Sequence, residues 1–94
     1  MKVFTVEYHY VTDRDDEMAE VRPTHRAFNG ELAEQGKLIA AGPYVGTHDA
    51  LIVVRAESAE AALELLENDP FNQAGFIAKR TPRQWNPVIG QIEA

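Results

Sequence analysis

The sequence predicts an α+β domain with the element order β-α-β-β-α-β, the ferredoxin-like sandwich. Four short segments are rich in apolar and β-branched residues, and two segments with helical spacing separate the first from the second and the third from the fourth. A length of 94 residues allows one domain, spanning residues 1–94. Right-handed crossovers then place both helices on one face of a sheet with strand order 4-1-3-2.

The first half of the chain supplies one strand and the main helix. Residues 3–11 alternate in a way that places Phe4, Val6, Tyr8 and Tyr10 on one face of a strand. Residues 12–17 form a polar turn, and residues 15–21 can form a short helical turn. We expect the main helix to start at Arg22–Pro23, because proline suits the first helical position, and to end near Gln35, before Gly36.

The second half supplies three strands and a second helix. Residues 38–41 predict a strand that ends at Gly42–Pro43, and residues 50–54 predict a strand that is apolar on both faces. A helix follows Ser58, a good N-cap, and closes at residues 68–70. After a polar link, residues 75–85 predict a last strand, which Pro82 assigns to an edge of the sheet, and residues 86–94 form a tail.

Composition excludes several classes of function. Nine basic and 15 acidic residues give a net charge of −6, which argues against binding nucleic acid or an anionic membrane surface. We find no signal peptide and no apolar run long enough to span a membrane, so we expect a cytoplasmic protein. A small core without cysteine, together with a sheet face that no helix covers, predicts a homodimer that packs these faces together.

The predicted topology gathers distant residues at one edge of the sheet. His25 shares its helix side with the apolar residues Val21, Phe28 and Leu32. Following the chain direction places this side next to the bend at residues 42–44, the turn at Asp69 and the end of the first strand. Segments that converge in this way can form a pocket.

His25 and Asp69 are the candidate catalytic pair. A carboxylate bound to one ring nitrogen fixes the tautomer and favours the charged imidazole, whereas a helix start disfavours that charge. Such a histidine can exchange a proton near neutral pH. Arg22, one turn earlier, is the candidate for binding an acid group of the substrate. The candidate pocket walls and substrate-binding residues are Tyr8, Tyr10, Pro43, Tyr44 and Phe71.

Each candidate also has a structural interpretation. A histidine on an apolar helix face is often a core residue, and Asp before Pro often forms a turn. Arg22 can be a surface charge, and the tyrosines can be sheet residues. His9, His25 and His48 lack paired ligand spacing, so we predict no metal site and no cofactor. The basic residues of the last strand suit an exposed edge: Lys79, Arg80 and Arg83.

The chain resembles the YCII-related (YciI-like) family. The resemblance rests on the segments R22-P-T-H25, G36-K-L leading to A41-G-P, S58-A-E-A-A and N68-D-P-F71. It implies a dimeric α/β barrel with a catalytic His–Asp pair, and these roles fall on His25 and Asp69. Family members often carry glycine where the third strand begins. Residues 47–50 read Thr-His-Asp-Ala here, so His48 can enter the pocket.

These observations predict a small cofactor-independent enzyme of lyase or isomerase type. It would act on a small metabolite that is unsaturated or aromatic-derived and that can carry a negative charge. Two alternatives stay open. One is a non-catalytic module that binds a small ligand, or an accessory module. The other is a cofactor-free monooxygenase, a class that the dimeric α/β barrel group also contains.

Overall fold

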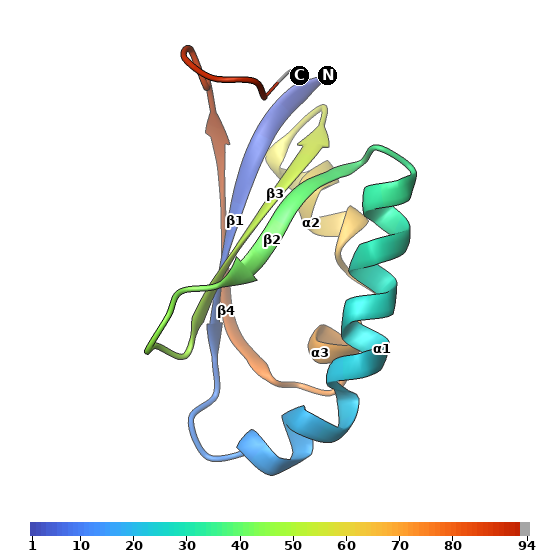
Figure 1. The fold of residues 1–94 in the computed structure, drawn as a ribbon, viewed down its shortest axis with the longest axis vertical. Helices are drawn as coiled ribbons and strands as arrows, with labels where there is room; N and C mark the ends of the chain where they lie inside the picture. Colours follow the sequence, from blue (N-terminus) through green and yellow to red (C-terminus); the bar gives the residue numbers. More distant parts are fainter. Residues whose placement is uncertain (93–94) are drawn as a thin grey trace.

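The structure, a computed structural model, describes residues 1–92 and has four strands and three helices. In chain order they are β1 (Lys2–Tyr10), α1 (Asp15–Glu34), β2 (Leu38–Pro43), β3 (Asp49–Ala56), α2 (Ala59–Leu65), α3 (Pro70–Gln73) and β4 (Ile77–Trp85). The strands form one antiparallel sheet in the order β2-β3-β1-β4, and the helices lie on one side of it (Figure 1). The predicted fold, the central β1 and β3 and the edge position of β4 are confirmed.

The start of the main helix was predicted wrongly. One helix of 20 residues runs from Asp15 to Glu34, with Pro23 inside it. Asp15, Asp16 and Glu17 lie in its first turn, where acidic side chains favour helix formation. Met18 is buried against Phe71 and Phe76. This burial offsets the roughly 3 kcal/mol that an interior proline costs, and the first turns of α1 lie at an angle to the rest of the helix (Figure 1).

Other boundaries also differ from the predictions, including the start of the last strand, which is Ile77 rather than Gly75. β2 continues through Gly42 and Pro43, because an edge strand tolerates a residue without an N–H group. The segment expected to be a polar link contains α3, whose N-cap is Asp69 and whose first residue is Pro70. β3 extends the predicted strand by one residue at its start and two at its end. α1 ends as expected, and Gly36 takes a φ of 77°, a left-handed conformation that suits glycine.

The core has two parts. The larger part lies between the sheet and the helices, around Val6, Ile52, Val54 and Leu66. The smaller part consists of Met18, Phe71 and Phe76, with Tyr10 and Val21 packed against it. This second cluster joins the first turns of α1 to α3, so it determines where the middle of α1 lies relative to the turn before α3.

Candidate functional site

The site is built around a hydrogen-bonded pair. His25 Nδ1 lies 2.7 Å from Asp69 Oδ1, across 44 positions of sequence. Asp69 is fully buried, and the His25 side chain is 13% exposed. An ionised carboxylate only accepts hydrogen bonds, so Nδ1 carries the proton and donates it. In the neutral ring, Nε2 is then the basic nitrogen that remains for a ligand.

Helix α3 explains why Asp69 is held in place. Asp69 Oδ1 also accepts a hydrogen bond from the backbone N–H of Phe71, at 2.9 Å, which caps the start of α3. One carboxylate oxygen therefore serves both the helix cap and the imidazole. His25 itself lies about three turns into α1, so the predicted influence of a helix start on its charge does not apply.

Phe71 fixes the plane of the imidazole. The rings of His25 and Phe71 stack with centroids 3.9 Å apart and 3° between their planes. Tyr10 meets Phe71 edge to face at 5.7 Å, and the guanidinium carbon of Arg22 lies 6.0 Å from the Phe71 ring centroid. The imidazole is thus held by a hydrogen bond in its plane and by an aromatic ring on its face.

Two neighbouring hollows meet at His25. The first, which we call the groove, lies between α1 and β2, has a volume of about 450 Å³, and is lined mainly by small and apolar residues such as Gly30, Ala33 and Leu38. The second, the polar hollow, has about 470 Å³ and contains Arg22, Asp15, His48 and Asp49. Both hollows are lined by Tyr10, His25, Arg26 and Pro43. A ligand that spans them would pass beside the imidazole.

The phenols near Asp69 are held in their neutral form. Burial raises the pKa of Tyr10 to about 12, with a further contribution from the charge of Asp69 and an opposing one from Arg22. Burial, again with the charge of Asp69, raises the pKa of Tyr8 well above its usual range. Neither phenol is a base at neutral pH, so both can only donate or accept hydrogen bonds there.

The predicted site residues do not all reach the hollows. Arg22, Pro43 and Phe71, three of the predicted substrate-binding residues, line the polar hollow. Tyr8 is completely buried and lies outside the linings of both hollows. Tyr44 lies in the turn after β2, where it is 44% exposed, and it also lines neither hollow. Alternation along a strand predicts which face a residue takes, but not how deep it lies.

Two residues of the site were not singled out from sequence. Arg26 and Asn29 line the groove one turn beyond Arg22 and His25, on the same stripe of α1. This spacing of four was a usable signal, because all of these residues lie in the helix that was predicted from sequence. His48 lines the polar hollow, where its Nε2 lies 3.4 Å from Asp15 Oδ1. The predicted approach of His48 to the pocket is therefore seen.

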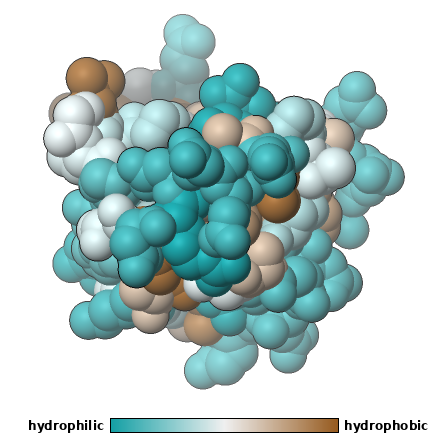
Figure 2. Space-filling view, turned by 90° about the horizontal axis from the view of Figure 1, so that it is seen from below, coloured by the Kyte–Doolittle hydropathy of each residue, from teal (hydrophilic) through white to brown (hydrophobic). Residues whose placement is uncertain are grey.

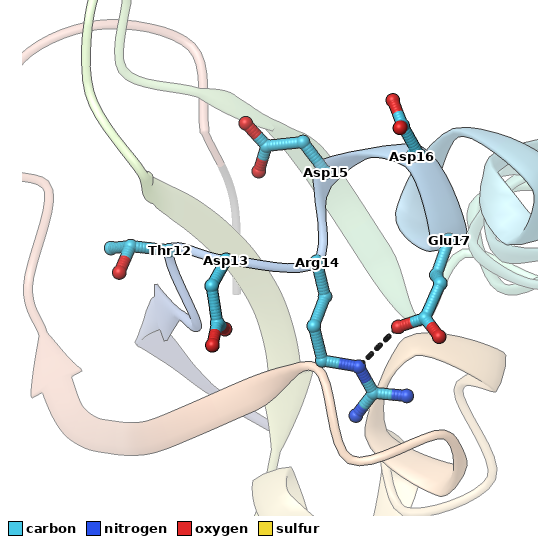
Figure 3. A pocket seen from close by; sticks show the side chains of 6 residues that line it. All are labelled: Thr12, Asp13, Arg14, Asp15, Asp16 and Glu17. Carbon is cyan, nitrogen blue, oxygen red and sulfur yellow. Dashed lines mark hydrogen bonds and ion pairs between the residues drawn. The ribbon is translucent and has the colours of Figure 1, made fainter.

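The end of the molecule that carries residues 12–17 offers no comparable site. The surface at this end is mainly hydrophilic (Figure 2). A third hollow there is lined only by residues 12–17, whose carboxylates point in different directions, while Arg14 pairs with Glu17 (Figure 3). Within residues 1–92 no three His, Asp or Glu side chains group closely enough to hold a metal ion. In the same residues, no helix has the length and hydrophobicity to cross a membrane.

A family model for the YCII-related domain matches residues 1–86. The chain belongs to the YCII-related family. The segments that carried the resemblance include both members of the His25–Asp69 pair. No curated protein matches the chain significantly.

Solved structures with a similar fold are distant in sequence. One is 5-chloro-2-hydroxyhydroquinone dehydrochlorinase (TftG) from Burkholderia phenoliruptrix AC1100, in complex with 2,5-dihydroxybenzoquinone. It is 22% identical, with 89% of this chain and 93% of that chain covered and a TM-score of 0.77. A putative antibiotic biosynthesis monooxygenase from Nitrosomonas europaea is 13% identical, with 95% and 100% covered and a TM-score of 0.59. A NIPSNAP family protein from Agrobacterium tumefaciens is 18% identical, with 92% and 91% covered and a TM-score of 0.57. At these identities the likeness establishes the fold.

Proposed function

We propose that this protein is a small enzyme of lyase or isomerase type that uses His25 as a general acid–base and needs no cofactor. The observation that carries the proposal is the 2.7 Å bond between His25 Nδ1 and Asp69 Oδ1, in a ring that lines both hollows. Asp69 fixes the tautomer and balances the positive charge that develops when Nε2 takes a proton. The buried carboxylate would orient the base, and the open nitrogen would do the chemistry.

The two hollows suggest how a substrate would bind. Arg22 and Arg26 line the polar hollow next to His25, although the chain as a whole carries a net charge of −6. Guanidinium groups bind carboxylates and enolates through directed hydrogen bonds. The groove would take a small, flat, apolar part of the molecule. The likeness to a dehydrochlorinase solved with 2,5-dihydroxybenzoquinone supports a small unsaturated substrate.

We also propose that the protein is a homodimer. The helices cover one face of the sheet, and the other face carries Leu51 and the 42% exposed Trp85 beside Thr5 and Arg83. Packing two such faces would remove these side chains from water, and similar folds are dimeric in the group that the family resemblance names. Sedimentation analysis of the wild-type protein checks this directly, and a monomer at micromolar concentration would exclude it.

Turnover by a His25→Ala variant tests the mechanism. A panel of hydroxyquinones, chlorinated hydroxyhydroquinones and unsaturated carboxylic acids is incubated in deuterated water, and deuterium incorporation or chloride release is measured. For any compound that the wild-type enzyme converts, loss of the general base should lower the rate by about a hundredfold or more. A matched control is His9→Ala, since His9 forms a 2.9 Å pair with Asp49 and lines neither hollow. A His25→Ala variant that keeps the full rate would refute the mechanism.

A non-catalytic role has one observation in its favour. Asp69 caps α3 and His25 stacks on Phe71, so the pair also holds α3 against α1. Replacement of either His25 or Asp69 would destabilise the fold whether or not the pair is catalytic. Stability alone therefore does not separate the two functions. Ligand binding without conversion of any compound in the panel would favour the binding module. Oxygen uptake with a quinol would favour the monooxygenase, the class named for one similar structure.

A further inference from the structure

Tyr8 and Asp69 each bury an oxygen atom for which the hydrogen-bond network gives no account. Both side chains are completely shielded from solvent. Within residues 1–92, Tyr8 Oη and Asp69 Oδ2 are two of only three buried side-chain polar atoms without a hydrogen bond of ordinary geometry. A buried polar atom without a partner costs about 1–3 kcal/mol, so two such atoms in one core are unexpected unless they serve each other.

The two groups are neighbours. The charge of the Asp69 carboxylate helps to raise the pKa of the Tyr8 phenol, and the charge of Arg80 acts on the same pKa in the opposite direction. Arg80 lies directly across from Tyr8 in the register of β1 and β4. The phenol therefore lies near both a carboxylate and a guanidinium. A hydroxyl hydrogen can turn to suit its acceptor, and in this field it turns toward the carboxylate.

We propose that Tyr8 is a positioning residue whose hydroxyl donates a hydrogen bond to Asp69 Oδ2. The carboxylate then has three donors, because Oδ1 already accepts from His25 Nδ1 and from the N–H of Phe71. A carboxylate held at both oxygens cannot rotate about its own axis. The direction of the Nδ1–H bond is thereby fixed, and with it the direction in which Nε2 faces the hollows.

This role replaces the one predicted for Tyr8 from sequence. The residue lines neither hollow, so it cannot touch a bound substrate and acts on the imidazole only through Asp69. Tyr10, two residues along β1, takes the outer place, where it lines both hollows and packs against Phe71. The inference deepens the proposed function of the same site, but its test follows the pair itself and needs no substrate.

The first test is a Tyr8→Phe variant observed by NMR of the imidazole of His25. In the wild type we expect the Nδ1–H proton to exchange slowly and to give a separate signal. Tyr8→Phe removes one oxygen and keeps the ring that fills the core, so the fold should persist, while the signal should shift and broaden. Tyr44→Phe is the control, because Tyr44 lines neither hollow, and it should leave the signal in place. A folded Tyr8→Phe variant with an unchanged signal would overturn the proposal, since a purely space-filling tyrosine predicts that result.

A second measurement does not depend on that variant. With tyrosines labelled at Cζ, the chemical shift of Tyr8 at neutral pH is compared by NMR in the wild type and in Asp69→Asn. Removal of the carboxylate should shift the Tyr8 signal, because the phenol loses its charged acceptor. Tyr44, which is 44% exposed and lines neither hollow, serves as the internal reference. An identical Tyr8 chemical shift in the two proteins would exclude the contact, whatever the enzyme is later found to convert.

Discussion

Replacing Asp69 with alanine should destabilise the protein by about 3–4 kcal/mol. The variant loses a charge-assisted hydrogen bond to His25 Nδ1 at 2.7 Å, worth about 1.5–3 kcal/mol, and the cap on the Phe71 N–H at 2.9 Å, worth about 1 kcal/mol. It also leaves a small void in a side-chain site that is 0% exposed. Asp69→Asn should cost less, about 1–2 kcal/mol, because an amide oxygen can still accept both bonds.

The two His–Asp pairs of this chain provide a matched control. His9 and Asp49 lie 2.9 Å apart, but their side chains are 39% and 38% exposed. An exposed pair of this kind contributes less than about 1 kcal/mol, so Asp49→Ala should hardly change the free energy of unfolding. The contrast between the two alanine variants compares a buried pair that also caps a helix with an exposed pair at a similar contact distance.

The assay is urea unfolding at pH 7, followed by far-UV circular dichroism and by the fluorescence of Trp85, the single tryptophan. Equal m values for the variants and the wild type would show that the same surface is exposed on unfolding. A change of 3–4 kcal/mol should also lower the melting temperature by roughly 15–25 °C in a domain of this size. An Asp69→Ala variant whose free energy of unfolding lies within about 0.5 kcal/mol of the wild type would refute the reasoning. The buried carboxylate and its two hydrogen bonds would then contribute almost nothing to stability.

Three further outcomes can be checked. Gly30→Leu should weaken binding of an aromatic carboxylate such as benzoate at least tenfold in isothermal titration, because Gly30 lines the groove. Stability should be kept, because a Cβ at Gly30 meets nothing within 4 Å. Ala27→Leu is the control, since Ala27 lines neither hollow, and equal affinities of the two variants would contradict the assigned groove. Arg26→Gln should weaken the same binding, whereas Arg83→Gln, outside both hollows, should not, and the two are compared in high and low salt. The free energy of unfolding should fall between pH 10 and 12, because the Tyr10 phenol ionises near pH 10 in the unfolded chain but keeps its proton up to about pH 12 in the folded one. Tyr10→Phe should make this fall with pH less steep, and denaturant unfolding over the same pH range measures it.

Much of the fold could be read from local pattern. Alternation in β1, the continuous apolar run in β3, the N-cap Ser58 and the stop at Gly36 each depend on a residue and its near neighbours, and all appear in the structure. Pro23 misled the prediction for the same reason. Proline does favour a helix start locally, but the burial of Met18 against α3 stabilises about two further turns of α1 before Pro23.

The sequence by itself determined the order of the four strands and the two longer helices and the sheet topology, because crossover handedness and chain direction leave few alternatives. It also placed His25 and Asp69, as a candidate pair, at the same edge of the sheet, where they form a hydrogen bond. Only the tertiary structure decided which side chains reach the hollows. Tyr8, Tyr10 and Tyr44 look alike in sequence, yet one is sealed in the core, one lines both hollows and one lies exposed in a turn. How deeply a side chain is buried depends on the distance between the sheet and the helices that cover it. That distance is set by packing between residues far apart in the chain, which no local pattern contains.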